Sequence, residues 1–431
     1  MKRGCISKTT NIIGSFRILK GNTRISVLFE PMWGIPFVMF NFYLSLYMKE
    51  LGVTNQQIGY LISIGFISGT VFSLFAGVIT DRLGRRKTTL IFDFISWPFC
   101  ILIYTLSNSF LLFALATVAN NVTRIVGVSW NMMIIEDADN EQRLAAYNLI
   151  GIINIATGVI IPLAGIIVNI YGVVSSERIF LVFAFISMSA MIILRNRLYK
   201  ETSTGKRILE ENRLNPVKNS FKSILPLKAA VEYKKNPVAI LVFLLYILFN
   251  AYLPLGTINS LYFVPYMTEV MDLDESSVSI LGGVYSAAMF VVFVFIVPLI
   301  GRFSKTANLI VGLLIQVASI LLLILIPSGS LLQASVCIIL FALGFGIFRP
   351  FIDLLFAEVT EGRERAGIYS IVFTFTCVVT ALIGFVSGSI YAFNPRLIYI
   401  MSIAILLICI LVLLIFEKIR IKQTDMNTIE E

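Results

Sequence analysis

Histidine is absent from this chain of 431 residues, and cysteine is scarce. Without histidine there are no imidazole metal ligands, no Ser-His-Asp or Cys-His catalytic groups and no histidine proton relay. A phosphate-cradling loop that ends in Gly-Lys-Ser or Gly-Lys-Thr is also missing, which excludes ATP hydrolysis by that device. The five cysteines form neither a Cys-x-x-Cys pair nor a disulfide pattern: Cys5, Cys100, Cys337, Cys377 and Cys409. We therefore expect no enzymatic activity, no cofactor and no metal.

Charged residues are also few, at 14%, while 58% of the residues are hydrophobic and the mean hydropathy is +0.89. A water-soluble core cannot hold that much hydrocarbon, whereas a bilayer accepts helices of about 20 apolar residues. The sequence therefore predicts an all-α membrane protein with twelve transmembrane helices. Apolar runs place the spans at 27–47, 56–80, 88–106, 110–134, 144–170, 178–196, 237–265, 276–300, 307–327, 330–356, 367–391 and 396–416.

The basic residues gather on one side of these spans. Of the 34 Lys and Arg residues, 29 fall in the end segments and loops of one side, and three fall in the opposite loops. Because basic residues near span ends are retained in the cytoplasm, we expect both termini and the long central loop there. The N-terminal segment lacks a cleavable signal-peptide pattern. Anionic lipids, rather than nucleic acid, account for the net charge of +9, and we expect a multi-pass protein of the cytoplasmic membrane.

The chain is organised in two halves joined by a polar linker. We expect an N-terminal segment at 1–26, six spans in 27–196, a linker at 197–236, six spans in 237–416 and a tail at 417–431. A short amphipathic helix on the membrane is expected at 221–233 of the linker.

The halves resemble each other in their loops. The loop of Glu136 and Arg143 and the loop of Glu358 and Arg365 match at an offset of 222. A second echo pairs Asp81-Arg-Leu-Gly-Arg85 with Gly301-Arg-Phe-Ser-Lys305 at 220, where only the basic positions agree. Internal repeats of this kind are typical of transporters.

The loop between the second and third spans reads Gly77-Val-Ile-Thr-Asp81-Arg82-Leu-Gly84-Arg85-Arg86-Lys87. It resembles the signature loop of the major facilitator superfamily. The resemblance implies two six-helix bundles related by a pseudo-twofold axis, in which this loop holds the cytoplasmic gate closed and releases it during transport. A short carboxylate beside helix termini and Arg suits such a contact. Alternatively, Arg85, Arg86 and Lys87 only anchor the topology.

Small residues recur at a spacing of four in two spans. They are Gly65, Gly69, Ser73 and Gly77 in the second span, and Thr380, Gly384 and Gly388 in the eleventh. Such a stripe lets another helix backbone approach closely. The resemblance implies that these two spans meet across the halves, so the stripes are expected to form a sliding interface, with static packing as the alternative.

The fifth span contains Gly158-Val-Ile-Ile-Pro162-Leu-Ala-Gly165. This segment is similar to the glycine and proline motif that proton-driven exporters of the superfamily carry there, although Ile161 and Ile166 replace two of its glycines. A proline-kinked packing helix is the alternative.

Five charged residues lie inside the predicted spans, where each costs about 2.5 to 3.5 kcal/mol unless it is paired or hydrated. They are Glu30, Asp93, Arg124, Arg349 and Asp353. We expect Arg349 and Asp353, four apart, to pair on one helix. A Glu30–Arg124 pair is expected if the first and fourth spans face the central cavity, as the resemblance implies. Arg124 is also similar to the span-four arginine that the family links to proton transfer.

These charges are the candidates for coupling, with Glu30 first and Asp93 or Asp353 second. Burial and a nearby Arg act oppositely on a carboxylate, so it can bind and release a proton as the Arg moves. Permanent ion pairs that fix helix register are the alternative. Mid-span amides and phenols are candidates for binding a substrate: Asn41, Asn121, Asn131, Tyr246, Asn250 and Asn259.

Three functions remain open from the sequence. We expect a secondary transporter of a small molecule, with proton-coupled export as the first choice. An uptake symporter or facilitator for a sugar or other nutrient is second, although the Pro-Glu-Ser-Pro-Arg type segment of sugar porters is absent after the sixth span. A non-transporting sensor or assembly factor is third. Monomers are common in the family, so we expect a monomer among membrane lipids.

Overall fold

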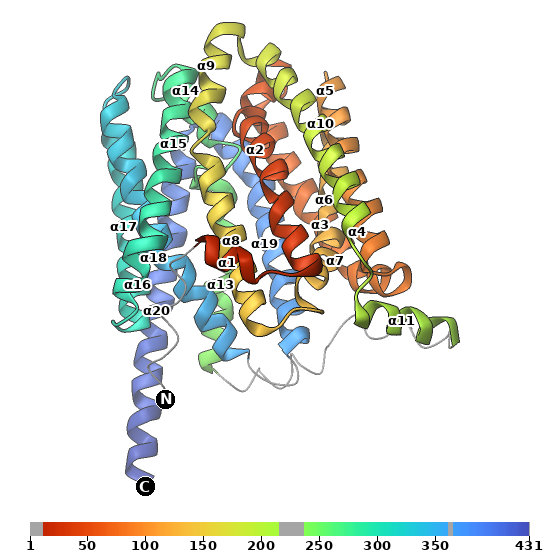
Figure 1. Cartoon of the computed structure of the whole chain (residues 1–431). Coiled ribbons are helices and arrows are strands. Elements are labelled where there is room, and N and C mark those ends of the chain that lie inside the picture. The colour runs from red at the N-terminus through yellow and green to blue at the C-terminus, as the bar shows by residue number, and fades with distance from the viewer. Residues whose placement is uncertain (1–11, 215–236, 361–364, 431) are drawn as a thin grey trace. The chain divides into compact units, whose positions relative to one another are not determined.

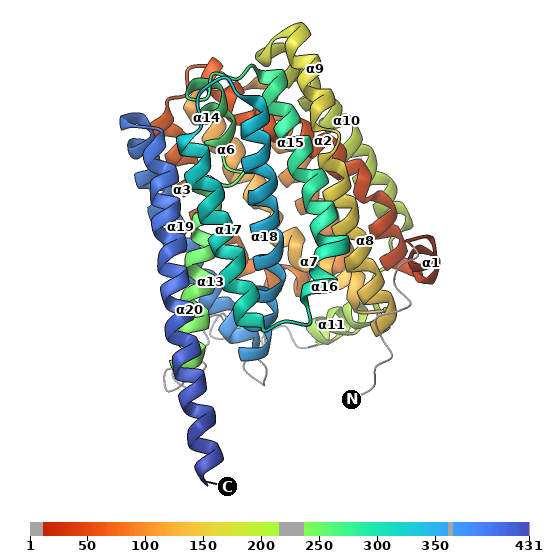
Figure 2. The ribbon, with the colours of Figure 1, turned by 90° about the vertical axis from the view of Figure 1, so that its left-hand side faces the viewer.

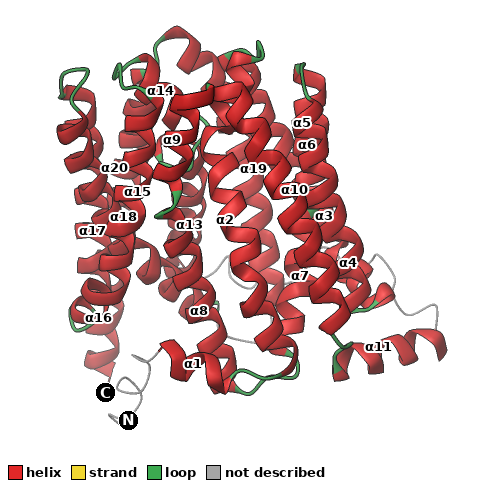
Figure 3. Ribbon diagram, turned by 45° about the horizontal axis from the view of Figure 1, so that its top comes forward, coloured by secondary structure: helices red, strands yellow, loops and turns green. Residues whose placement is uncertain are grey.

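The computed structural model describes residues 12–214, 237–360 and 365–430. Within these residues every regular element is a helix, and no strand occurs (Figure 3). Twelve helical segments of the described part are long and apolar enough to cross a membrane. The predicted all-α membrane fold with twelve spans is therefore confirmed.

Large apolar side chains cover the outside of the helices. Leu111, Ile186 and Leu382, for example, are 75%, 61% and 64% exposed. In water such surfaces would associate, but in a bilayer they face lipid of the same polarity, and each helix bonds its own backbone groups internally. The exposed surface thus fits a protein whose solvent is lipid.

The structure divides into two compact units. Unit 1 comprises residues 1–52 and 67–221, and unit 2 comprises residues 53–66 and 222–431. The boundary passes through the second span, because the first turns of that helix pack against a helix of unit 2.

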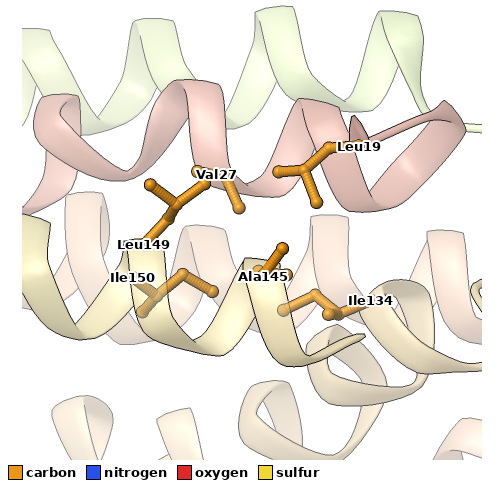
Figure 4. Packing of buried hydrophobic residues seen from close by; sticks show 7 residues of the cluster. Leu19, Val27, Ile134, Ala145, Leu149 and Ile150 are labelled. Atoms are coloured by element: carbon orange, nitrogen blue, oxygen red, sulfur yellow. The ribbon is translucent and has the colours of Figure 1, made fainter. Parts of the chain in front are cut away.

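Unit 1 contains the first six spans apart from this segment. Its helices are α1 (Ile12–Ile18), α2 (Gly21–Glu50), most of α3 (Asn55–Leu83), α4 (Arg85–Phe94), η1 (Ile95–Phe99), α5 (Cys100–Leu106), α6 (Phe110–Asn121), α7 (Thr123–Ile135), α8 (Asn140–Gly158), α9 (Ile161–Tyr171), α10 (Val173–Leu198) and α11 (Ser203–Leu214). Apolar residues of α2, α7 and α8 form one core cluster around Val27, Ile134 and Leu149 (Figure 4).

Unit 2 contains the remaining spans. Its helices are α13 (Pro237–Gly256), α14 (Phe263–Glu269), α15 (Glu275–Val291), η3 (Val292–Ile296), α16 (Val297–Ile300), α17 (Lys305–Leu325), α18 (Leu331–Val359), α19 (Arg365–Phe393) and α20 (Arg396–Glu430). Helices α17 and α18 pack along each other, which Figure 2 shows, and α13 packs against α19 and α20. Gly312 of α17 and Gly344 of α18 face each other, so the backbones of these two helices come close.

Three of the spans are interrupted near a proline. The third span contains the π-helical turn η1 with Pro98 inside it, and the eighth contains η3 just before Pro298. The fifth span stops at Gly158 and resumes at Ile161, with Pro162 in the first turn of α9. Because proline lacks an N–H, it cannot bond the carbonyl four residues back, and the helix widens or breaks.

The seventh span is shorter than predicted. We expected 237–265, but α13 ends at Gly256 and a turn precedes α14. Hydroxyls replace the missing helical donors, since Thr257 donates to the Leu253 carbonyl and Ser260 to the Leu255 carbonyl. Asn259, predicted at mid-span, is exposed in this turn.

The linker contains the helix α11 rather than only polar coil. Figure 1 shows α11 lying across the end of unit 1 at which α10 stops. The amphipathic helix expected at 221–233 lies outside the described residues.

Candidate functional site

A small cavity inside unit 1 gathers most of the unusual side chains of this half. Its volume is about 280 Å³, and α2, α4, η1, α7, α8 and α10 supply its walls. The lining residues are Glu30, Trp33, Asp93, Trp97, Thr123, Val126, Gly127, Trp130, Ile150, Asn154, Met191 and Arg195. All three tryptophans of the chain are among them. We call this space the tryptophan cavity.

Two carboxylates and one guanidinium meet in the tryptophan cavity. Arg195 forms an ion pair with Asp93, and both side chains are buried. Glu30 is 6% exposed and lies near Arg195 and Asn154, which line the same cavity. With one cation for two acids, the site carries an unbalanced negative charge whenever both acids are ionised. A buried charge must be balanced, so Glu30 needs a proton or another cation.

Aromatic rings form the apolar part of the cavity. The Trp33 ring stacks on Phe37 at 4.7 Å between centroids and meets Trp97 edge-on at 5.4 Å. Such contacts hold the rings in place. Because the face of an indole ring attracts cations, rings beside an acidic group suit a cationic ligand.

Tyr199 closes the end of α10 next to Arg195. The guanidinium lies 5.5 Å from the Tyr199 ring centroid, and the phenol shares a 2.6 Å hydrogen bond with Ser26. Burial raises the pKa of Tyr199, so this hydroxyl stays neutral. It therefore orients Arg195 without adding charge.

The expected pair of Glu30 with Arg124 is wrong, because Arg195 is the cation beside Glu30. Arg124 instead packs on α3, where its side chain and that of Asn121 fill the space next to Gly69. The pair was predicted because Arg124 and Glu30 lie in the same half of their spans, but the side chain of Arg124 lies next to Gly69. Arg195 was missed because it lies next to the predicted end of the sixth span and was counted among the basic residues that flank it.

A second polar cluster lies in unit 2. Arg349 pairs with Asp353 at 2.9 Å on α18, as their spacing predicts, and also donates to the Asn250 amide oxygen at 3.0 Å. The ring of Tyr246 stacks on Phe356 at 4.2 Å. Each charge here has a partner, so this cluster carries no unbalanced acid.

The loop with the superfamily signature has a buried centre. Arg85 is 2% exposed and pairs with Asp81 and Glu136, each at 3.0 Å. Thr202, just before α11, donates to Glu136. Two carboxylates thus hold Arg85, and the Thr202 hydroxyl holds one of these carboxylates, which links the second, third and fourth spans to the linker.

Gly84 makes the turn of this loop possible. Its φ of +83° favours glycine, and an added Cβ would lie 2.8 Å from Glu201 and 3.0 Å from Leu209. Glu201 accepts from the backbone N–H groups of Arg85 at 2.9 Å and Arg86 at 3.0 Å, so a carboxylate caps α4. The other expected loop residues are on the surface: Arg82 is exposed, and Gly77 faces open space.

The matching loop of unit 2 is simpler. Lys305 pairs with Glu358, and the two side chains are 41% and 43% exposed. Arg143 of the first repeat donates to the Ile135 carbonyl at 2.9 Å, at the end of α7. The side chain of Arg365, its counterpart, lies outside the described part.

Helices α3 and α19 touch at their backbones within unit 2. A Cβ on Gly59 would lie 2.6 Å from the Gly384 carbonyl, and one on Gly388 would lie 2.7 Å from the Gln56 carbonyl. Gly384 and Gly388 of the expected stripe on α19 are thus in close contact with α3, and Gly59 faces them there.

The remaining predicted residues do not line the tryptophan cavity. Asn41 is half-buried in α2, and Asn131 is exposed and accepts from Tyr147 at 3.1 Å. Gly158 and Gly165 are buried on either side of the break in the fifth span. Sequence reasoning missed Trp33, Trp97 and Asn154 as cavity residues. The restriction of tryptophan to three positions was the signal available for the first two.

Comparisons with known proteins agree with this architecture. The family model described as Major Facilitator Superfamily matches residues 33–260 and 248–425. Quinolone resistance protein NorA of Staphylococcus aureus (strain MRSA252) is 23% identical over 396 residues, which cover 89% of this chain and 94% of NorA.

Solved transporters share the fold at low identity. The nucleoside transporter NupG gives a TM-score of 0.69 at 14% identity, over 94% of this chain and 100% of that one. A bacterial homologue of the iron transporter ferroportin gives 0.68 at 14% identity, over 92% and 98% of the two chains.

Proposed function

Because the chain belongs to the Major Facilitator Superfamily, it is a membrane transporter of small molecules, and we propose that it exports an organic cation in exchange for protons. The observation that carries this proposal is the charge balance of the tryptophan cavity. Asp93 takes Arg195, which leaves Glu30 as the acid without an ion pair of its own. Glu30 is therefore the group that we assign to coupling.

Exchange follows from competition for one carboxylate. When Glu30 is ionised, the cavity has one negative charge too many, and either a proton or a cationic substrate removes the excess. If a proton on Glu30 and a cationic substrate were bound at the same time, the cavity would carry one excess positive charge. Proton and substrate therefore bind in turn, which is the condition for antiport under alternating access.

The tryptophan rings support the choice of an organic cation. Three indole rings give a ligand apolar contact and cation–π attraction, while Glu30 gives it a counter-charge. The similarity to NorA, whose name refers to quinolone resistance, supports export of a drug-like compound.

We also propose the orientation that the basic residues indicate. The end of unit 1 with Asp81, Arg85 and α11 is assigned to the cytoplasm, because Lys and Arg concentrate there. Both termini then lie inside the cell, and the single chain acts as a monomer.

Proton movement in proteoliposomes tests the proposed exchange. Wild type and Glu30→Gln are compared with an internal pH dye while lipophilic cations, sugars and organic acids are added in turn. For wild type we expect a lipophilic cation to drive protons in the opposite direction. Glu30→Gln keeps the shape but cannot ionise, so coupled proton flux should fall at least tenfold.

Asp353→Asn is the matched control, since it removes an acid that already has Arg349 as its partner. It should keep coupled flux within about threefold of wild type. Loss of coupling in Asp353→Asn but not in Glu30→Gln would move the proton site to unit 2. Substrate and proton moving in the same direction would indicate symport and overturn the proposed exchange.

A further inference from the structure

The linker helix α11 is fixed to the signature loop and to the turn after α7 by several polar contacts. Ser203 donates its hydroxyl to Asp137 at 2.5 Å, and Asn212 donates to the Asp81 carbonyl at 2.9 Å. Near the start of α11, Gly205 is buried against Glu201, Thr202 and the Arg85 side chain. Helix α11 therefore has a defined place on unit 1.

A cavity of about 750 Å³ lies between α11 and the start of α4. It is separate from the tryptophan cavity, with which it shares no lining residue. Its lining residues are Arg82, Leu83, Arg86, Lys87, Leu90, Asn196, Glu201, Leu209, Asn212 and Arg213. We call it the linker cavity.

The linker cavity has a strong excess of positive charge. Four of its side chains are basic and one is acidic. That acid, Glu201, already accepts from two backbone N–H groups of α4. Neighbouring acids are also occupied, because Asp81 and Glu136 bind Arg85, and Glu211 lies near Arg207.

Three of the four cationic groups remain available to a ligand. Arg86 is held by the Asn196 carbonyl, at 2.8 and 3.1 Å. Arg82, Lys87 and Arg213 are exposed, and they form no ion pair with any described residue. Two guanidinium groups and one ammonium around one space are suited to a phosphate group, which accepts bidentate hydrogen bonds from Arg.

The apolar residues of the cavity favour a phospholipid over free phosphate as the ligand. Leu83, Leu90 and Leu209 line the same space. A free phosphate has no apolar atoms to pack against these leucines, whereas a phospholipid has glycerol and acyl carbons next to its phosphate. Basic pockets at the cytoplasmic end of transmembrane helices are known binding sites for anionic headgroups.

We propose that the linker cavity binds the phosphate-bearing headgroup of an anionic phospholipid of the inner leaflet. The inference rests on the orientation proposed above, but not on the direction of transport or on Glu30. Arg82 and Lys87 from the signature loop and Arg213 from α11 hold the phosphate. A bound lipid therefore joins α11 to the loop that contains Arg85.

Lipid retention by the purified full chain tests this site. The protein is placed in nanodiscs with equal amounts of phosphatidylglycerol and phosphatidylcholine, and the lipids that stay bound on release into detergent are counted by native mass spectrometry. Wild type should retain phosphatidylglycerol preferentially. Arg82→Gln with Arg213→Gln should weaken that retention roughly thirtyfold, since each basic group near the surface contributes a factor of about five.

Arg302→Gln with Lys305→Gln is the matched control, because it removes two basic residues from the matching loop of unit 2. It should keep retention within about twofold of wild type. Arg82→Lys with Arg213→Lys preserves the charge, and it should retain the lipid better than the Gln pair. This comparison separates loss of the site from loss of folding.

Three outcomes would overturn the proposal. Equal retention of the two lipids would exclude an anionic site, and equal losses in the Gln pair and in the control pair would indicate diffuse attraction. Displacement of phosphatidylglycerol by millimolar inorganic phosphate would assign the cavity to a soluble anion. Retention that survives phosphate and depends on Arg82 and Arg213 supports the lipid.

Discussion

The signature loop of unit 1 and the matching loop of unit 2 occupy equivalent places in the repeat, but their ion pairs differ in burial. In unit 1, Arg85 is 2% exposed and has two carboxylate partners, while in unit 2 Lys305 is 41% exposed and has one. The difference comes from the linker, because Glu201 and Thr202 cover the first loop. Ion pairs at matching positions of the two repeats therefore need not stabilise the fold equally. The segment that buries an ion pair determines how much it contributes.

Removing the central cation of each loop should have the largest effect and the sharpest contrast. Arg85→Ala leaves Asp81 and Glu136 facing each other without a cation, and we expect the unfolding free energy to fall by about 3–5 kcal/mol. Lys305→Ala breaks an exposed pair and should cost less than about 1 kcal/mol. Thermal unfolding in detergent measures both.

Equal losses in the two variants would contradict the comparison, because burial would then not matter. Arg85→Lys gives a further check. A single ammonium cannot hold Asp81 and Glu136 in the forked geometry of Arg85, so this variant should fall between Arg85→Ala and wild type.

A methyl group added to each loop should have a smaller effect. Gly84→Ala must keep φ at +83° and place its Cβ 2.8 Å from Glu201, so we expect a loss of about 1–3 kcal/mol. Gly301→Ala meets nothing closer than 3.6 Å at a helical φ of −57°, and it should be neutral or slightly stabilising. Unfolding temperatures compare them, and proteolysis of the linker shows whether α11 loosens in Gly84→Ala. Intact protection of the linker in that variant would mean that Gly84 does not seat α11.

The smallest effect should come from helix caps, which are alike in the two units. Asp139 accepts from the Gln142 N–H at the start of α8, and Asp274 bonds Ser277 at the start of α15. These hydrogen bonds lower the pKa of each aspartate. The stabilisation is thus present above the unfolded pKa of about 3.9 and is lost as the pH falls through the lower folded value.

Asp274→Ala should cost about 1 kcal/mol or less at neutral pH and nothing in strong acid. Asp139→Ala should show the same pH dependence of the unfolding temperature. If Asp139→Ala lost clearly more stability than Asp274→Ala, unit 1 would be more sensitive to substitution throughout, and not only where the linker covers it.

The spans were predictable because hydropathy and basic flanks act locally along the chain. Ten of the predicted spans correspond to helices whose ends lie within about six residues of the prediction, whereas α20 continues from the predicted end at 416 to Glu430. The prediction for α13 was wrong because the hydroxyls of Thr257 and Ser260 end this helix inside an apolar run. The Arg349–Asp353 pair was predictable for the same reason, since both residues lie on one helix.

The tryptophan cavity was less predictable because it depends on distant contacts. Helix α10 begins before the predicted start at 178, so Glu177 was left out of the span although it is buried. Arg195 lies next to the predicted end at 196 and was counted as a basic flanking residue, although it is buried too. Arg195 reaches Asp93 across 102 positions. Gly59 was missed likewise, because nothing local in the sequence shows which glycine of α3 faces Gly384 and Gly388.

The placement of all three tryptophans around one cavity has a practical consequence. Indole absorbs at longer wavelengths than the phenol of the 16 tyrosines, so excitation at the red edge selects these three rings. The fluorescence of the whole protein is then the fluorescence of this cavity. A compound that enters it should quench or shift the emission of the unlabelled protein, and one that binds elsewhere should leave the spectrum unchanged.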